Sequence, residues 1–481
     1  MFRFLLTLFS HFGNELCCVN FAKTTPMKKL ILAFILLVFL FAHVNSEAQN
    51  LKRRGFLGLK SSAVVTDSLR KLKNISVEKG ILVVEVAPNS TLEVLKIQTG
   101  DVIFKLNNKP VTGMGDLRTF AKLFREGDDV MIDVERTGEN MSVMGKVAPY
   151  PFESSDKYDV VYDEVKFIGG YLRVIVNKPK GEGKFKSIFF VPGYNCFSTD
   201  NLGMHPYGQL ISGLVEKGYA VMRVEKPGMG DCFGTPDCES IDFDTELKAF
   251  QSGFDKFLTY EFVDKGNVFV FGHSLGGYVA PYIAMNDVVK GTIVYGTGVK
   301  TWYEYLIEMF RFQNILSGDD YVENEKFIFK AIPMLYDYLI MKKTPAELSK
   351  NAEYKSMLTT LMEYDGGEHV WGRHYKFWQD LQDKNMPEIW KSVKGDVLII
   401  RGEADLESFS NVDNQLIADI VNFYHPGNAK FVLMPGIDHG FAKIDTPAES
   451  LEKRKVRGFY YENFNPAIVD KTDEWIKSVG N

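Results

Sequence analysis

Long apolar runs and helical patterns alternate through the C-terminal two thirds of the chain. Several runs are continuously apolar, which is typical of strands buried on both faces of a parallel sheet. The runs predict strands at 186–193, 219–228, 267–274, 291–298, 396–405 and 430–440. Helical patterns fall between or after them at about 206–217, 244–262, 275–286, 412–424 and 466–478. This alternation predicts an α/β fold over residues 159–481, a doubly wound and mostly parallel sheet with its site at the carboxyl ends of the strands.

A different pattern of short strands precedes it, over residues 52–148. Residues 80–111 read as strand, short helix and strand, with a helix start at Pro88-Asn89-Ser90 and a turn at Asn107-Asn108. An amphipathic helix is expected at 114–124. Two alternating strands follow, joined by a turn at 137–140. We therefore expect a small, mainly-β domain, separated from the rest by the aperiodic stretch 147–158.

A segment at about 299–394, within the α/β region, is dense in Tyr, Trp, Phe and Met. Apolar residues recur at helical intervals, as at Trp302, Leu306, Met309 and Phe310. They can pack onto the core of the α/β region, or they can line a hydrophobic pocket for an acyl group. The pattern leaves both interpretations open.

The N-terminus carries a targeting pattern. Met27-Lys28-Lys29 is followed by 13 apolar residues, LILAFILLVFLFA, and by Ser46 and Ala48 flanking Glu47. A basic start, a short apolar centre and small residues predict a secretory signal peptide at 27–48, with residues 1–26 as an upstream extension. The alternative is an uncleaved membrane anchor, although the run is short for a span. The expected location is outside the cytoplasm, periplasmic or secreted.

Length, charge and cysteine content narrow the function classes. The chain has 481 residues and a formal net charge of -6, which predicts two or three domains and argues against a nucleic-acid surface. After signal removal three cysteines remain, Cys196, Cys232 and Cys238. An oxidising compartment permits one disulfide among them and leaves one thiol.

The sequence FVFGHSLGG, residues 269–277, contains the first catalytic candidate. Ser274 ends a predicted strand directly before a predicted helix, which is the context in which a G-x-S-x-G motif indicates a nucleophile. Gly272 and Gly276 remove side chains that would crowd a strained turn. A serine hydroxyl needs a general base, because it is barely ionised at neutral pH.

A histidine and a carboxylate follow in the order such a serine requires. His439 directly follows the apolar part of the last predicted strand and is the expected base. Asp405 ends the strand before it and is the expected acid, with Glu403 as its rival. Asp438, adjacent to His439, cannot easily reach around to the ring. The order Ser274, Asp405, His439 is the one expected of this kind of fold.

The loop after the first predicted strand of this region offers an oxyanion hole. Gly193 lets the backbone turn, and the N–H of Tyr194 is the first expected donor. The N–H of Leu275, just after the nucleophile, is the second.

These pieces together resemble the α/β-hydrolase superfamily, nearest to its esterase and serine-aminopeptidase-like branches. The resemblance covers 159–481 and rests on VPGYN, EKPGMGDCFG, GHSLGG, RGEAD and PGIDHGF, in the order of the family. It implies that the segment at 299–394 is a helical lid over the site. Two positions depart from the family pattern: Cys232 stands where relatives often carry serine, and Pro192 where many carry histidine. Cys238 can pair with Cys196 or with Cys232.

Residues 52–148 resemble a PDZ domain of the bacterial type found beside proteases. The resemblance rests on RRGFLGLK, on APNSTLEVLKIQTGDVIFKLNNKPV and on the helix after them. It implies that the backbone N–H groups of Gly55, Phe56, Leu57 and Gly58 bind the C-terminal carboxylate of a peptide, which adds as a strand. The alternative is a PDZ fold that serves only as a spacer or a dimer contact.

The sequence therefore predicts an exported serine hydrolase that cleaves a carboxylic ester and needs no cofactor or metal. His369 and His374 lack the carboxylate or cysteine pattern of a metal site. A serine peptidase or aminopeptidase guided by the PDZ-like module is the second hypothesis, and a non-catalytic binding protein is the third. The expected partners are a small ester or peptide substrate and a peptide C-terminus, with no nucleic acid and no stable membrane span after signal cleavage.

Overall fold

The computed structural model of the protein describes residues 50–479. The predicted signal peptide at 27–48, the extension before it, Cys17 and Cys18 lie outside these described residues. Within them, no helix combines the length and the apolar character that crossing a membrane would need.

The N-terminal sheet is built from residues 59–146. Its strands run in the order β1-β2-β3-β5-β6, with β4 paired to β3, so β1 lies at an edge. Ile81, Ile103, Ile132 and Val134 of the central strands are buried together. The elements are β1 (Leu59–Val64), α3 (Asp67–Lys73), β2 (Ile81–Val86), α4 (Thr91–Val94), β3 (Val102–Leu106), β4 (Lys109–Pro110), α5 (Met114–Leu123), β5 (Asp129–Arg136) and β6 (Glu139–Lys146).

The local signals of this region match its elements. Ser90 caps α4, and Asn107 and Asn108 form the turn between β3 and β4 with φ of 48° and 63°. Asparagine tolerates this left-handed backbone better than most residues. The predicted turn at 137–140 is shorter than expected, because Glu139 already begins β6.

The second sheet has eight strands in the order β16-β15-β12-β11-β9-β10-β8-β7. All six predicted strands are present in it and run parallel to one another. The strands are β7 (Tyr158–Phe167), β8 (Gly170–Pro179), β9 (Phe185–Val191), β10 (Ala220–Val224), β11 (Val263–His273), β12 (Val289–Tyr295), β15 (Asp396–Gly402) and β16 (Ala429–Met434).

One hairpin of this sheet has no counterpart among the predicted elements. β7 and β8 pair antiparallel from Tyr158 to Pro179, and β8 then pairs antiparallel with β10. Most side chains of β7 are half-buried, and Asp163, Glu164 and Lys166 interrupt its apolar residues, so the strand has no continuous apolar run. The sheet is therefore mostly parallel, with an antiparallel edge.

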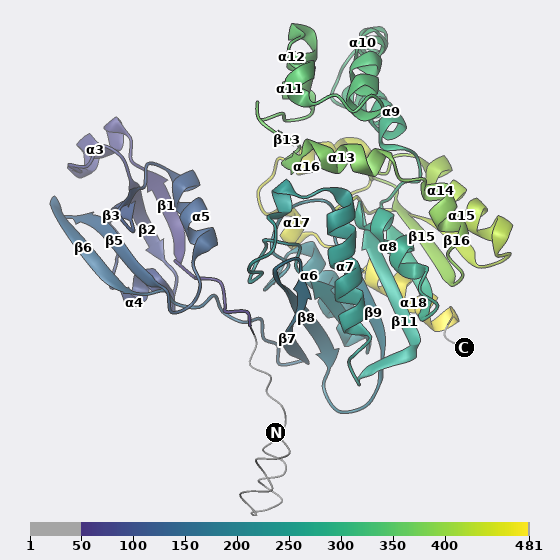
Figure 1. Ribbon diagram of the computed structural model, residues 1–481, viewed down its shortest axis with the longest axis horizontal. Helices are drawn as coiled ribbons and strands as arrows, with labels where there is room; N and C mark the ends of the chain where they lie inside the picture. Colours follow the sequence, from purple (N-terminus) through teal and green to yellow (C-terminus); the bar gives the residue numbers. More distant parts are fainter. Residues whose placement is uncertain (1–49, 480–481) are drawn as a thin grey trace, which may run out of the picture. The chain divides into compact units, whose positions relative to one another are not determined.

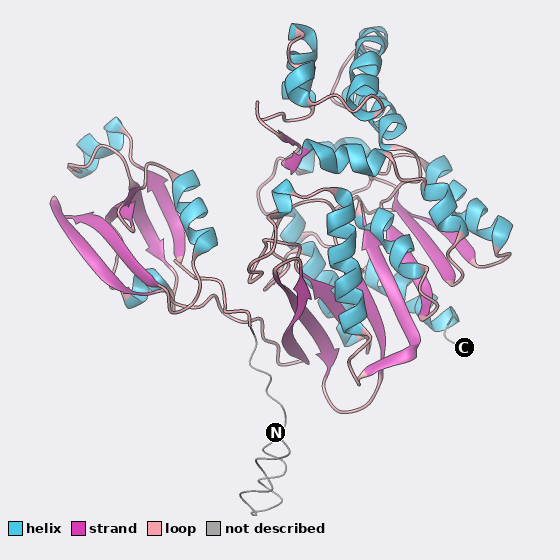
Figure 2. Ribbon diagram, in the orientation of Figure 1, coloured by secondary structure: helices cyan, strands magenta, loops and turns pink. Residues whose placement is uncertain are grey.

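Helices cover both faces of the second sheet (Figures 1 and 2). Along β11, Val268 and Val270 pack in one apolar cluster and Phe269 and Phe271 in the other, as the two-residue period of a strand requires. The first cluster includes residues of α7 (Phe243–Phe257), α8 (Gly276–Ala284) and α15 (Asn411–Tyr424). The second includes residues of α6 (Pro206–Glu216) and α18 (Ala467–Val479). This two-layer burial is the doubly wound arrangement that the sequence predicts.

The segment between β12 and β15 is mainly helical, as predicted, and its first helices gather at the top of Figure 1. A two-stranded hairpin at 369–374 interrupts it. Leu306 and Phe310 are buried in the large core cluster, while Trp302 stacks on Trp378 at 4.9 Å. Its elements are α9 (Trp302–Leu316), α10 (Tyr321–Leu339), α11 (Pro345–Leu348), α12 (Ala352–Leu361), β13 (His369–Val370), β14 (Arg373–His374), α13 (Tyr375–Gln382) and α14 (Met386–Lys391).

The remaining short helices lie in loops of the second sheet. They are η3 (Cys238–Ser240), α16 (Pro447–Lys453) and α17 (Phe459–Glu462).

Candidate active site

The predicted site residues follow the carboxyl ends of parallel strands. Gly193 follows β9, Ser274 follows β11, Asp405 follows β15 and His439 follows β16. Because these strands run in the same direction, their carboxyl ends meet at one edge of the sheet.

Ser274 occupies a strained turn between β11 and α8. Its φ is 54°, a left-handed value that is uncommon for a residue with a side chain. A Cβ on Gly272 would lie 2.5 Å from the carbonyl oxygen of Gly276, and a Cβ on Gly276 would lie 2.3 Å from that of Val191. Only glycine fits at these two positions, so the motif reflects close packing around the serine.

Asp405 and His439 are in direct contact. The Nδ1 atom of His439 lies 3.0 Å and 2.9 Å from the two carboxylate oxygens of Asp405. Asp405 is completely buried, and its Oδ1 also accepts the N–H groups of Glu407 and Ser408, each at 2.8 Å. These two hydrogen bonds hold the Asp405 carboxylate in place independently of its contact with His439. Glu403, the predicted rival, is exposed.

Asp438 stabilises the turn that carries His439. Its Oδ1 accepts the N–H groups of Gly440 and Ala442 at 3.0 Å, and its Oδ2 accepts the hydroxyls of Ser450 and Tyr460 at 2.7 Å. This carboxylate is therefore occupied within its own loop.

A second histidine, His273, connects the serine turn to the His439 loop. Its Nε2 lies 2.8 Å from the carbonyl oxygen of His439, which can only accept, so the proton sits on Nε2. Its Nδ1 then accepts the hydroxyl of Tyr207 at 2.6 Å, and the Tyr207 oxygen accepts the N–H of Gly193 at 3.1 Å. Burial and the charge of His439 lower the pKa of His273 far below its usual value, which keeps this bridge neutral.

Glu407 is a second carboxylate beside the imidazole, and no sequence pattern singles it out. Its Oε2 lies 3.7 Å from His439 Nδ1, and its Oε1 pairs with Arg454 at 2.6 Å. Burial disfavours the charged imidazole, but the charges of Asp405 and Glu407 and the Asp405 hydrogen bond outweigh it. The pKa of His439 is raised to about 9, with Arg454 acting in the opposite direction.

This electrostatic arrangement predicts the pH dependence of any reaction that uses His439 as a base. Only the neutral imidazole can accept a proton, so kcat/KM should rise about tenfold per pH unit between about pH 6 and 8 without a plateau. Glu407→Gln removes a charge that raises the pKa, and should move the rising limb to lower pH. Arg454→Gln removes a charge that lowers it, and should move the limb the other way. Superimposable pH profiles of kcat/KM for the three proteins would contradict this account.

The loop after β9 lies against the serine turn. A Cβ on Gly193 would lie 3.3 Å from Ser274 Cβ. Within the described residues, the N–H groups of Tyr194 and Leu275 donate no hydrogen bond to the protein. Both are therefore free to bind an external acceptor.

The Ser274 hydroxyl and the His439 ring are not hydrogen-bonded to each other in the described structure. Their backbones are nevertheless close, since His273, the residue before Ser274, bonds to the His439 carbonyl. The two imidazole rings of His273 and His439 lie with their centroids 4.8 Å apart. Catalytic hydrogen bonds often close only when substrate binds.

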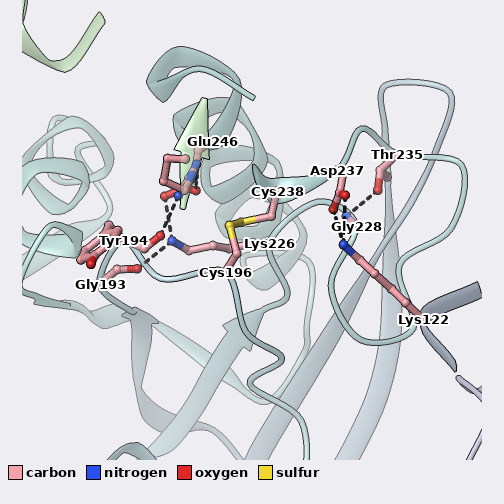
Figure 3. Close-up of a disulfide and its surroundings, with 11 residues drawn as sticks. Lys122, Gly193, Tyr194, Cys196, Lys226, Gly228, Thr235, Asp237, Cys238 and Glu246 are labelled. Carbon is pink, nitrogen blue, oxygen red and sulfur yellow. Dashed lines mark hydrogen bonds and ion pairs between the residues drawn. A yellow bond between two sulfur atoms is a disulfide. The ribbon is translucent and has the colours of Figure 1, made fainter. Parts of the chain in front are cut away.

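A disulfide joins Cys196, two residues after Tyr194, to Cys238 in η3 (Figure 3). Cys232 remains a buried free thiol. Cys238 is therefore paired with Cys196 and not with Cys232. The disulfide connects the Tyr194 loop to η3.

Two groups of potential metal ligands occur in the described part of the chain. His369 Nδ1 bonds to Asp365 at 2.8 Å, and its ring centroid lies 6.4 Å from that of His374. Asp405, Glu407 and His439 bring one ligand atom each within 4.8 Å of one another. In that second group Nδ1 already contacts Asp405, and Arg454 already pairs with Glu407. These contacts hold the imidazole and both carboxylates in place.

In the N-terminal sheet, the predicted carboxylate loop has two of its N–H groups already in use. Gly55 and Phe56 donate to the carbonyl oxygens of Phe124 and Ala148, each at 2.8 Å. Leu57 and Gly58, immediately before β1, donate to no acceptor outside the strand ladder among the described residues. Of the four N–H groups predicted to bind a peptide carboxylate, those of Leu57 and Gly58 remain as candidates.

Comparisons with known proteins agree with this fold. The profile of the alpha/beta hydrolase family matches residues 188–449, more than half of the 481 residues. The chain belongs to the alpha/beta hydrolase family. A PDZ domain profile matches residues 62–147. The predicted architecture, an α/β-hydrolase preceded by a small PDZ region, is confirmed, and the protein is a hydrolase by family.

Individual relatives match parts of this hydrolase. Its PDZ region is similar to the periplasmic pH-dependent serine endoprotease DegQ of Escherichia coli K12, 32% identical over 91 residues, 19% of this chain and 20% of that protein. The periplasmic serine endoprotease DegP of the same strain is 30% identical over 91 residues, 19% of either chain. The match spans about a fifth of the length of these curated relatives.

Two solved structures resemble the larger part of the hydrolase. Est1E from Butyrivibrio proteoclasticus with ferulic acid bound is 18% identical, with 62% of this chain and 98% of that chain covered and a TM-score of 0.39. The acylaminoacyl peptidase of Pyrococcus horikoshii is 14% identical, with 72% and 49% covered and a TM-score of 0.38.

Proposed function

We propose that this protein is an exported serine hydrolase that cleaves a carboxylic ester through an acyl-enzyme. The observation that carries the proposal is the contact of His439 with the buried Asp405, on the loops of two neighbouring parallel strands. Ser274 lies on a strained turn beside them. An imidazole whose Nδ1 is held by a carboxylate presents Nε2 as a base.

In the proposed mechanism the Ser274 oxygen attacks the ester carbonyl while His439 Nε2 takes the hydroxyl proton. Asp405 fixes the ring and stabilises the imidazolium. The N–H groups of Tyr194 and Leu275 bind the oxyanion of the tetrahedral intermediate. Collapse breaks the bond to the alkoxy group, which leaves with the proton from His439. Water, deprotonated by the same ring, then hydrolyses the acyl-enzyme.

An ester is preferred over an amide because an alcohol leaves more readily than an amine. The two carboxylates that contact His439 are also both engaged, Asp405 by the imidazole and Glu407 by Arg454. Neither is free to bind the ammonium group of a peptide substrate. A serine peptidase guided by the PDZ region is the alternative, and a non-catalytic binding protein is a third.

The proposal is tested by a fluorophosphonate probe and a substrate panel. The folded protein should be labelled on the peptide that contains Ser274, and heat-denatured protein should not be labelled. Short-chain aryl esters should turn over faster than aminoacyl and peptidyl anilides. Rapid cleavage of the anilides without hydrolysis of the esters would favour the peptidase. The absence of both labelling and turnover would favour the non-catalytic binding protein.

For the PDZ region we propose binding of a peptide C-terminus at the free edge of β1. The N–H groups of Leu57 and Gly58 are the remaining donors for the carboxylate, and an edge strand can accept a peptide as a further strand. Peptides with free and amidated C-termini test this in a binding assay. Equal affinity for the two forms would leave a spacer or dimer contact as the better interpretation.

Export is proposed from the pattern at residues 27–48. The disulfide between Cys196 and Cys238 supports an oxidising compartment. The similarity of the PDZ region to that of proteins named as periplasmic points the same way. Sequencing the N-terminus of the mature protein tests cleavage after residue 48, since an uncleaved anchor would retain residues 27–48.

A further inference from the structure

Three buried charged side chains lie against the oxyanion loop. Lys226 follows β10, Glu246 belongs to α7, and Arg373 comes from β14 of the helical insert. Their side chains are 1%, 3% and 1% exposed. Glu246 joins the two cations, with its oxygens 2.9 Å from Lys226 Nζ and 2.8 Å from Arg373 Nη2.

Both cations also donate to the backbone of the oxyanion loop. Lys226 Nζ lies 2.7 Å from the carbonyl oxygen of Gly193, and Figure 3 shows this bond beside the one to Glu246. Arg373 Nη1 lies 2.6 Å from the carbonyl oxygen of Tyr194. The Arg373 guanidinium carbon lies over the ring of Phe377, 3.7 Å from its centroid. Two consecutive peptide carbonyls are thus each bound by a cation.

These contacts determine which backbone group of the loop stays free. The Gly193 N–H is used by Tyr207, and the carbonyls of Gly193 and Tyr194 are used by Lys226 and Arg373. The Gly193 carbonyl and the Tyr194 N–H belong to one trans peptide and point in opposite directions. Because Lys226 binds the Gly193 carbonyl, the Tyr194 N–H must point away from Lys226. A cation bound to the carbonyl also polarises the peptide, which makes its N–H a stronger hydrogen-bond donor.

Stability alone is a poor reason to bury these charges. Buried ion pairs recover little of their desolvation cost, so they are weak evidence of stabilisation. Burial lowers the pKa of Lys226 to about 8, with Arg373 lowering it and Glu246 raising it. Burial would raise the pKa of Glu246, but the charges of Arg373 and Lys226 outweigh this and lower it. At neutral pH the group is charged, with one cation in excess over the carboxylate.

We propose that Lys226 and Arg373, joined by Glu246, are positioning residues that orient the Tyr194 N–H for the oxyanion. The helical insert then contributes to the catalytic geometry through Arg373, in addition to covering apolar surface. This inference rests on the proposed Ser274 mechanism and adds to it a requirement for a specific insert residue.

The test compares Arg373→Met and Lys226→Met with the control Lys384→Met. Removing either cation leaves the other paired with Glu246, so no buried charge is left without a partner of opposite charge. Lys384 also lies in the insert and pairs with Asp244 of α7 at 2.6 Å and with Asp380 at 2.9 Å. It touches no carbonyl of the oxyanion loop. Lys384→Met therefore removes an ion-pair contact between insert and core that is partly exposed and lies apart from the oxyanion loop.

Each of the two cation variants should lower kcat about 10- to 100-fold and change KM less than about threefold. Affinity for a boronic acid, which forms a tetrahedral adduct with the serine, should fall by the same factor as kcat/KM. Lys384→Met should keep kcat and boronate affinity within about twofold. Arg373→Lys keeps the charge and should recover part of the lost kcat.

Two results would overturn the inference. One is wild-type kcat in Arg373→Met and Lys226→Met. The other is a fall in kcat that follows loss of thermal stability equally in all three variants, with boronate affinity unchanged. A wild-type protein with no labelling and no turnover would instead contradict the proposed function, so the two failures are distinguishable.

Discussion

Ser274→Ala is expected to lower kcat for the best ester of the panel on the order of 10⁶-fold, because it removes the oxygen that we propose as the nucleophile. The fold should survive the change. In the described structure the Ser274 hydroxyl makes no hydrogen bond, and only its backbone is bonded, to Tyr295 and Gly277. Turnover and thermal unfolding should be measured on the same preparations.

Ser274→Gly provides the matched comparison. Both variants lack the hydroxyl, but only glycine adopts a φ near 54° without strain, so the glycine variant should be about 1 kcal/mol more stable than the alanine variant. Equal inactivity with unequal stability would separate the chemical role from the folding role. Substantial turnover in either folded variant would exclude Ser274 as the nucleophile.

The parts of the site that the sequence predicts share one property: each lies within a few residues of a strand end. Ser274, Asp405 and His439 are recognisable because a buried strand, a sharp turn and a glycine fall together locally. A parallel sheet then brings those strand ends to one edge without any further information. The order of the motifs was therefore enough to predict that Asp405 and His439 would meet.

The features that the sequence did not predict depend on contacts between distant segments. Arg373 donates a hydrogen bond to the carbonyl of Tyr194, 179 positions earlier in the chain. No periodicity or spacing in the sequence predicts this bond. Glu407 is two residues from Asp405, but only the fold of its loop turns it toward His439. The choice of Cys196 over Cys232 as the partner of Cys238 is likewise a matter of three-dimensional proximity. The β7–β8 hairpin is not predicted for another reason. β7 is a half-buried edge strand without a continuous apolar run, and in the buried β8 the polar residues Arg173 and Asn177 interrupt the apolar run.

Asp405→Asn is expected to lower kcat/KM about 10⁴-fold with little change in fold. An asparagine oxygen can still accept the N–H groups of Glu407 and Ser408, which now bind Oδ1. The amide NH₂ would then face His439 Nδ1 and donate to it. That contact places the ring proton on Nε2, so the atom that should receive the serine proton is already protonated.

Glu403→Gln is the control, because it removes the same charge from the same loop at an exposed position. It should keep kcat/KM within about twofold of wild type, and its pH profile should be unchanged. Asp405→Asn should also move the remaining rising limb to lower pH, since Asp405 is one of the charges that raise the pKa of His439. If Glu403→Gln lost the activity and Asp405→Asn kept it, the acid of the triad would be Glu403, and the observed contact between Asp405 and His439 would be structural only.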